Sequence, residues 1–113
     1  MGNAIAFETA TIAKQDLHPG AGVALKVGDH QIALFCFPDF SPGYFAVGHR
    51  DPIGQANVIA RGILGDIGGE PVITSPLFKQ HFSLRTGVCV EQAEYALPVY
   101  DITISQNSVL VSL

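Results

Sequence analysis

Apolar and polar residues follow a strand-like pattern near the start of the chain. Residues 22–27 alternate between larger apolar side chains and small or polar ones, which predicts a β-strand with one buried face. Residues 31–37 then form a nearly continuous apolar run, which predicts a strand buried on both faces. Gly28-Asp29 between these stretches is typical of a two-residue hairpin turn. We therefore expect a β-hairpin in this part of the chain.

The remaining sequence predicts more short strands and little helix. Further strands are expected at 44–47, 72–74, 80–84, 102–105 and 109–113, the last two forming a terminal hairpin. Weak helical patterns cover residues 10–17 and a turn near 55–60, and the glycine-rich segment 62–69 is expected to be a turn region. Many short strands separated by turns indicate an all-β domain, either a small sandwich or a barrel.

Composition limits the size and the surroundings of this domain. The chain has 113 residues, 48% of them hydrophobic, which suits a single domain over residues 1–113 with its own core. Only 14% of the residues are charged, which favours a surface that is covered by a stable partner. The net charge of −4 argues against nonspecific nucleic-acid binding. Because neither a signal peptide nor a membrane-spanning run is evident, we expect a cytoplasmic protein with no membrane contact.

The basic residues are unevenly distributed. Most of them, and two of the four histidines, fall within one stretch: His49, Arg50, Arg61, Lys79, His81 and Arg85. This clustering is consistent with a local basic patch on an acidic protein, and equally with ordinary solvated charge.

The sequence gives little support for catalysis or metal binding by this chain. Cys36 and Cys89 are isolated and read as small buried residues on strands. None of the four histidines has a cysteine, histidine or carboxylate at a ligand spacing. Ser75 lacks a nucleophile elbow, and the segment 62–69 lacks the lysine of a phosphate-binding loop. We therefore expect no catalytic, cofactor-binding or metal-binding residue here.

Two proline-containing segments are the most distinctive feature. Asp51-Pro52-Ile53 is followed, after 21 residues, by Ser75-Pro76-Leu77-Phe78. A Rieske [2Fe–2S] centre is held by two cysteines and two histidines, in a Cys-x-His segment and a later Cys-x-x-His segment. The corresponding positions are Asp51, Ile53, Ser75 and Phe78, and none carries a thiolate or an imidazole. The pattern predicts a Rieske-like fold without a cluster.

The second segment leaves two interpretations open, which are compatible with each other. In one, Pro76, Leu77 and Phe78 pack as core and fill the space that a cluster would occupy. In the other, Lys79 and His81 project into solvent and meet an acidic or redox partner.

A family resemblance extends these expectations. Residues 22–113 resemble the small subunit of assimilatory NAD(P)H-dependent nitrite reductase, a Rieske-like family whose members lack the cluster. The resemblance is carried by Asp51-Pro52-Ile53 and by the segments 57–66, 69–72 and 75–87, which occur in the family's order. The family usually has an aromatic residue where this chain has Ile53.

The resemblance implies a fold, a partner and a role. The fold would be a Rieske-like antiparallel β-sandwich with a small inserted subdomain, about residues 49–87, in the place of the cluster-binding region. The partner would be a large subunit carrying FAD, [4Fe–4S] and siroheme, which reduces nitrite to ammonium in nitrate assimilation. This chain would bind none of these cofactors and would dock on and support the large subunit. We place the contact surface at Arg50, Asp51, Pro52, Arg61, Pro76, Lys79 and His81.

Two other functions remain open from the sequence. One is a stand-alone Rieske-like module that binds a different protein. The other is an oxygenase-type ferredoxin, against which the missing ligands count heavily.

Overall fold

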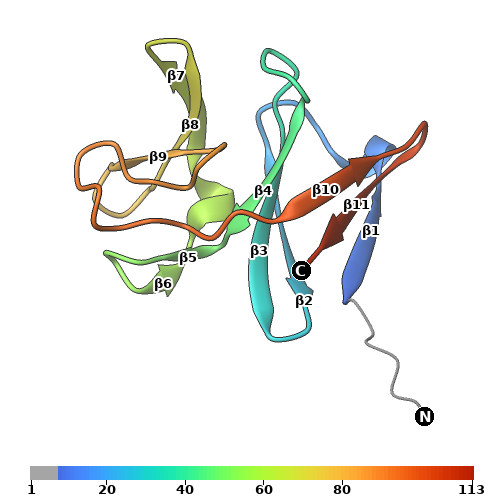
Figure 1. The fold of residues 1–113 in the computed structure, drawn as a ribbon, viewed down its shortest axis with the longest axis horizontal. Coiled ribbons are helices and arrows are strands. Elements are labelled where there is room, and N and C mark those ends of the chain that lie inside the picture. Colours follow the sequence, from blue (N-terminus) through green and yellow to red (C-terminus); the bar gives the residue numbers. More distant parts are fainter. Residues whose placement is uncertain (1–7) are drawn as a thin grey trace.

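The computed structural model describes residues 8–113, and its regular structure there is almost entirely β-strand (Figure 1). The elements are β1 (Thr9–Ala13), η1 (Lys14–Asp16), β2 (Gly22–Val27), β3 (His30–Cys36), β4 (Tyr44–Gly48), β5 (Arg50–Asp51), β6 (Ala56–Asn57), η2 (Ile59–Arg61), β7 (Ile63–Ile67), β8 (Glu70–Thr74), β9 (His81–Ser83), β10 (Asp101–Ile104) and β11 (Ser108–Ser112). Here η1 and η2 are single 3₁₀ turns. In residues 8–113 no helix has the length and hydropathy needed to cross a bilayer.

Two antiparallel three-stranded sheets form a sandwich. One has the strand order β1-β11-β10 and the other β2-β3-β4, and they face each other in Figure 1. Their inner faces share one core, to which β3 contributes Ile32 and Leu34 and β11 contributes Val109 and Val111. The predicted hairpins, β2–β3 and β10–β11, are both confirmed.

Strand β3 is buried on both faces, as the apolar run predicts. Ile32 and Leu34 point into the sandwich core, whereas Ala33 and Phe35 belong to a second cluster on the other side of the sheet. All four side chains are fully buried. Because side chains alternate along a strand, one continuous apolar segment supplies two cores.

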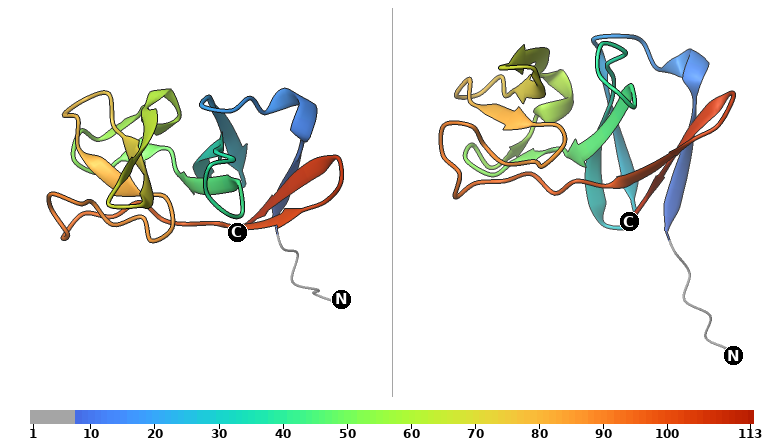
Figure 2. Two further views of the ribbon diagram at one scale, coloured as in Figure 1. Left: turned by 90° about the horizontal axis from the view of Figure 1, so that it is seen from above. Right: turned by 45° about the horizontal axis from the view of Figure 1, so that its top comes forward.

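The second core lies between the β2-β3-β4 sheet and a smaller unit at the other end of the molecule (Figure 2), which we call the small unit. The small unit contains the β5–β6 pair and the sheet β7-β8-β9. Ile59, Ile73 and Phe82 from this unit are fully buried against β3 and β4. Cys89 and Leu97 pack into the same cluster, so the segment 88–97 adds to the subdomain that we expect over residues 49–87.

Three local predictions from the sequence are wrong in detail. The weak helix over 10–17 is a strand followed by a 3₁₀ turn, because residues 9–13 pair along their whole length with β11. The turn near 55–60 is the short strand β6 followed by η2. The glycine-rich segment is mostly strand β7, and only Gly68-Gly69 turns the chain.

Candidate functional site

Two loops lie together in the small unit, and we call them the paired loops. Loop 1 is the whole β5–β6 hairpin, residues 50–57. Loop 2 covers residues 75–80 and connects β8 with β9. The side chain of Leu77 in loop 2 sits where a Cβ at Gly54 of loop 1 would be, so the loops are in direct contact. These are the two segments whose spacing the sequence singles out.

A buried hydrogen bond joins the paired loops. Ser75 Oγ donates to Asp51 Oδ2, and both residues are fully buried. The other carboxylate oxygen, Oδ1, accepts the backbone N–H groups of Ile53 at 2.8 Å and Gly54 at 3.0 Å. Buried carboxylates are tolerated when their oxygens are hydrogen-bonded in this way. Asp51 therefore holds both loops in place from the centre of the pair.

Each of the two loops contains a backbone turn of the same type. In loop 1, Gln55 N–H donates to Asp51 O at 2.7 Å, and in loop 2, Lys79 N–H donates to Ser75 O at 3.1 Å. Gln55 and Lys79 each have a left-handed backbone conformation, with φ of 57° and 61°. These are the two non-glycine residues with positive φ in the described chain. Non-glycine residues pay steric energy in this region, so the turn is imposed by the surrounding hydrogen bonds.

The predicted ligand positions do not converge on one point. Asp51 and Ser75 meet, Ile53 is half-buried against the second core, and Phe78 is 63% exposed. The prediction that the second segment packs as core is wrong for Leu77 and Phe78, because Leu77 is 41% exposed as well. The space between the loops is closed by a polar pair instead.

The residues present do not fit an iron–sulfur cluster. Asp51 and Ser75 bond directly to each other, and the side chains of Ile53 and Phe78 have no donor atom for iron. Within residues 8–113, no group of three or more His, Cys, Asp or Glu side chains is arranged to hold a metal ion. No electron-transfer step through this chain follows from its side chains.

We call the exposed residues Leu77, Phe78 and Lys79 of loop 2 the tip of the paired loops, and of the predicted interface residues Lys79 belongs to it. Arg50, Arg61 and Lys79 are exposed, and Lys79 Nζ donates to Pro76 O at 3.3 Å. Pro52 and Pro76 are half-buried. Asp51 is fully buried, so it supports this surface from below.

His81 has a carboxylate partner that the sequence did not reveal. Its Nδ1 lies 2.6 Å from Glu91 Oε2, and its backbone N–H donates to Glu91 Oε1 at 2.9 Å. Partial burial alone would raise the pKa of Glu91, but the hydrogen bonds and the charge of His81 outweigh burial and lower it. The ten-residue separation falls outside any ligand spacing, which is why the pattern gave no signal.

His49, at the end of β4, fixes the segment that leads to Arg61. Its Nδ1 accepts the N–H of Ala60 at 3.1 Å, and its carbonyl accepts the N–H groups of Val58 and Ile59. Burial, and to a smaller extent the charge of Arg61, lower the pKa of His49. His49 is thus a neutral hydrogen-bond acceptor within the fold rather than part of an exposed basic patch.

This arrangement predicts a pH dependence of stability. The pKa of His49 is below its ordinary value of 6.5 in the folded chain, so the unfolded chain binds more protons below that pH. The free energy of unfolding should therefore fall as pH drops from 6.5 towards the folded pKa. We expect His49→Asn, whose amide oxygen can accept the same N–H, to flatten the urea-unfolding profile between about pH 5 and 7. Exposed His18→Asn serves as control, and an equal flattening there would contradict the assignment.

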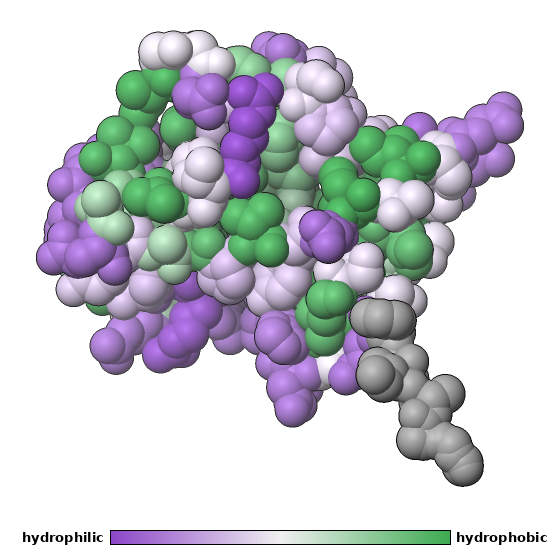
Figure 3. All heavy atoms as spheres, in the orientation of Figure 1, coloured by the Kyte–Doolittle hydropathy of each residue, from purple (hydrophilic) through white to green (hydrophobic). Residues whose placement is uncertain are grey.

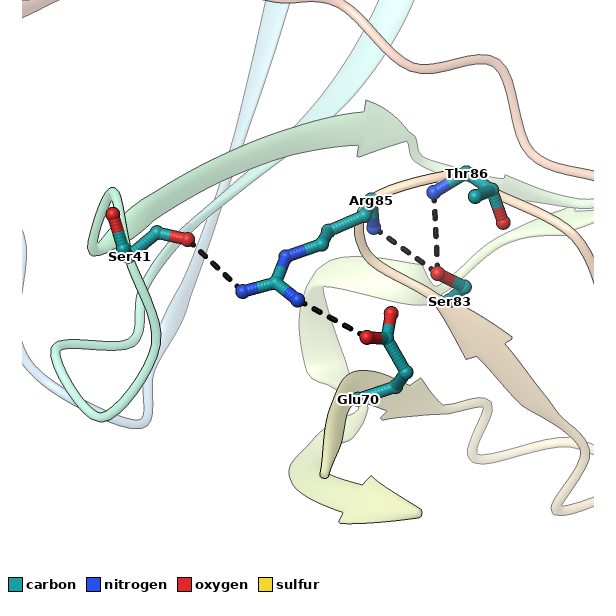
Figure 4. A network of polar contacts seen from close by, with 5 residues as sticks. All are labelled: Ser41, Glu70, Ser83, Arg85 and Thr86. Atoms are coloured by element: carbon teal, nitrogen blue, oxygen red, sulfur yellow. Dashed lines mark hydrogen bonds and ion pairs between the residues drawn. The ribbon is translucent and has the colours of Figure 1, made fainter. Parts of the chain in front are cut away.

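Arg85 connects the small unit to the sandwich (Figure 4). Its Nη1 donates to Glu70 Oε1 at 3.1 Å, and its Nη2 donates to Ser41 O at 3.2 Å in the β3–β4 loop. Ser83 Oγ accepts the backbone N–H groups of Arg85 and Thr86, which fixes the turn that carries the guanidinium. Arg85 therefore has a structural role, and its guanidinium is already hydrogen-bonded within the chain rather than available to the predicted basic patch.

Similarity to known proteins defines the class. Residues 9–112 match the Rieske-like [2Fe–2S] domain family. The NADH nitrite reductase small subunit of Salmonella typhimurium is 36% identical over 94 residues, covering 83% of this chain and 86% of that protein. A Mycobacterium tuberculosis structure reported as an NADH-dependent nitrite reductase small subunit superimposes with a TM-score of 0.88 at 36% identity, covering 96% and 97% of the two chains. This chain belongs to the family of Rieske-like nitrite reductase small subunits.

Two further similarities bear on function. The nitrite reductase [NAD(P)H] large subunit of Klebsiella oxytoca is 40% identical over 91 residues, which is 80% of this chain and only 9% of that protein. The ferredoxin of carbazole 1,9a-dioxygenase from Nocardioides aromaticivorans superimposes with a TM-score of 0.73 at 21% identity, over 92% of this chain and 93% of the ferredoxin. At that identity the ferredoxin shows a shared fold and nothing more.

Proposed function

We propose that this chain is the non-catalytic small subunit of an NAD(P)H-dependent nitrite reductase and docks on the large subunit through the tip of the paired loops. The observation that carries the proposal is the buried Asp51–Ser75 hydrogen bond, which joins the two Rieske-like loops at positions that offer a cluster neither thiolate nor imidazole. The Klebsiella oxytoca protein supports the choice of partner, since a stretch similar to this chain lies within a polypeptide named as a large subunit.

The tip has the character of a protein-binding surface. Phe78 and Leu77 are exposed apolar side chains on a loop with an imposed conformation, and Lys79 adds positive charge directly after them. Arg61 is a further exposed basic residue of the same small unit. Exposed aromatic residues surrounded by charge are typical of interface anchors. In this proposal FAD, [4Fe–4S] and siroheme belong to the large subunit, nitrite is reduced to ammonium there, and the complex works in the cytoplasm.

Co-purification tests the proposal directly. The chain and its cognate large subunit, produced separately and mixed, should elute together from a sizing column at a fixed ratio. Separate elution at micromolar concentrations of both proteins would contradict the docking role.

Charge reversal at Lys79 of the tip together with Arg61 should weaken the complex. We expect the double variant Arg61→Glu and Lys79→Glu to raise the Kd for the large subunit by about tenfold or more, mainly through slower association, because charges at an interface rim steer the encounter. The control is Lys14→Glu with Lys26→Glu, which changes the net charge equally on the sandwich. Equal weakening by both double variants, measured by surface plasmon resonance, would assign the effect to net charge and remove the tip as the site.

A further inference from the structure

Strand β7 is an open edge of the small unit. It pairs with β8 along all five of its residues, and the sheet order β7-β8-β9 leaves its other side without a neighbour among the described residues. In Figure 1 the β7–β8 hairpin projects at the upper left, away from the sandwich. An open strand edge presents unpaired N–H and C=O groups that another chain can pair with.

The outward face of β7 is apolar. Ile63 is 71% exposed and Ile67 is 41% exposed, while Leu64, on the opposite face, packs on the second core. Ile67 also borders a shallow hollow of about 420 Å³, whose other apolar walls are Val72, Val88, Cys89, Val90 and Ala93. Figure 3 shows hydrophobic surface over this end of the molecule. Val88 and Val90 are themselves 37% and 50% exposed.

Gly65, between the two isoleucines, has no explanation within the chain. Its φ is not in the left-handed region, and a Cβ added to it would meet no described atom within 4 Å. At Gly62, by contrast, a Cβ would collide with Thr74 O. Glycine weakens a strand interior, and it often marks a place where another backbone approaches closely.

The turn geometry shows which backbone groups face the open edge. Gly68 and Gly69 have φ of 59° and 87° and form a two-residue hairpin turn, so Ile67 and Glu70 are a hydrogen-bonded pair. Alternation then directs the N–H and C=O of Leu64 and Asp66 outward. Pro71, which has no N–H, stands opposite Asp66, as this pattern requires. The edge thus offers one donor and one acceptor on each side of Gly65, two donors and two acceptors in total.

Charge indicates what kind of segment would pair there. Asp66 is exposed on the open edge, and Glu70 lines the hollow. The guanidinium of Arg85 is already bonded to Glu70 and Ser41. A complementary segment would therefore carry apolar side chains at alternate positions and a lysine or arginine close to Asp66.

We propose that β7 receives an extended segment of the large subunit as an added β-strand, with its apolar side chains packed against Ile63, Ile67 and the hollow. This inference rests on the proposed function and adds a second contact to the paired-loop tip. The large subunit is favoured over a second copy of this chain because a β7–β7 pairing would join two strands that each carry an aspartate, Asp66, and no basic residue to offset it.

The sharpest test uses Gly65→Val. Because the new side chain meets no described atom and β-branched residues suit strands, the urea-unfolding midpoint should stay unchanged or rise. The Kd for the large subunit should nevertheless increase by about tenfold or more, since the valine fills the empty space above Gly65, between Ile63 and Ile67, in which an apolar side chain of the added strand would pack. If Gly65 mattered only for folding, Gly65→Val would not weaken binding while leaving the urea-unfolding midpoint unchanged or higher.

Two matched pairs support this test. Ile67→Lys should weaken binding, whereas Ile104→Lys, at a similar exposure on the sandwich, should not; the exposed fractions are 41% and 38%. Asp66→Pro removes an outward N–H and should weaken binding more than Asp66→Ala, which removes only the charge. Hydrogen exchange at the amides of Leu64 and Asp66 should slow in the complex.

The outcomes separate the inference from the proposed function. If the wild-type chain does not bind the large subunit, both are overturned. If it binds and Gly65→Val and Ile67→Lys bind equally well, the β7 contact is overturned while docking by the tip stands. If sedimentation shows that the chain alone forms a dimer which Gly65→Val dissociates, the edge is filled by a second copy and the inference is likewise overturned.

Discussion

Replacing Asp51 by alanine is expected to lower the free energy of unfolding by about 3 kcal/mol or more. The substitution leaves three donors without an acceptor, namely the buried hydroxyl of Ser75 and the part-buried N–H groups of Ile53 and Gly54. Each such group costs about 1–3 kcal/mol when it is left unpaired. Urea unfolding followed by circular dichroism gives the value directly.

Two controls identify the source of this effect. Asp39→Ala removes an exposed aspartate and should change the free energy of unfolding by less than about 0.5 kcal/mol. Ser75→Ala removes one of the three donors and should cost less than Asp51→Ala. In the double variant the two losses should be less than additive, because both residues share one hydrogen bond. Full additivity would mean that the Asp51–Ser75 bond does not tie the loops together.

Replacing Phe82 by alanine is expected to cost about 3–5 kcal/mol, the usual range for removing a buried aromatic side chain. Phe82 lies on β9, the strand that follows loop 2. Its side chain is fully buried and packs in the second core with Ile73 and Leu84. Its loss should therefore lower the free energy of unfolding and also loosen the packing of the strands that hold the paired loops.

Phe78→Ala is the matched control for this prediction. The same residue type at 63% exposure should contribute less than about 0.5 kcal/mol to stability. Under the proposed function it should still weaken binding to the large subunit. Equal destabilisation by Phe78→Ala and Phe82→Ala would mean that loop 2 is packed the other way round, with Phe78 inside as the sequence pattern suggested.

The strands were predictable because their signal is local. Alternation over residues 22–27 indicates a strand with one buried face, and the apolar run that follows indicates a strand with two buried faces. The fold class follows from the number of such segments. The segment 10–17 failed because its conformation is decided by pairing with β11 at the far end of the chain. No short window of sequence contains that partner.

The candidate site was only partly predictable for a related reason. Spacing identified the two loops and their missing ligands, but could not show that Asp51 and Ser75 bond to each other. An acidic and a hydroxyl residue, each directly before proline at the two first-ligand positions, were the available signal. The outward direction of Phe78 follows from the turn that ends at Lys79, and a left-handed residue other than glycine leaves little trace in sequence.

The central claim is that the paired loops bind the large subunit without a cluster. The most direct test compares two preparations of this chain, one refolded in the presence of an iron chelator and one purified from iron-replete cells, by their Kd for the cognate large subunit. Equal Kd values and no stoichiometric iron in either preparation are the expected result. Stoichiometric iron in the second preparation, with binding lost in the first, would contradict it.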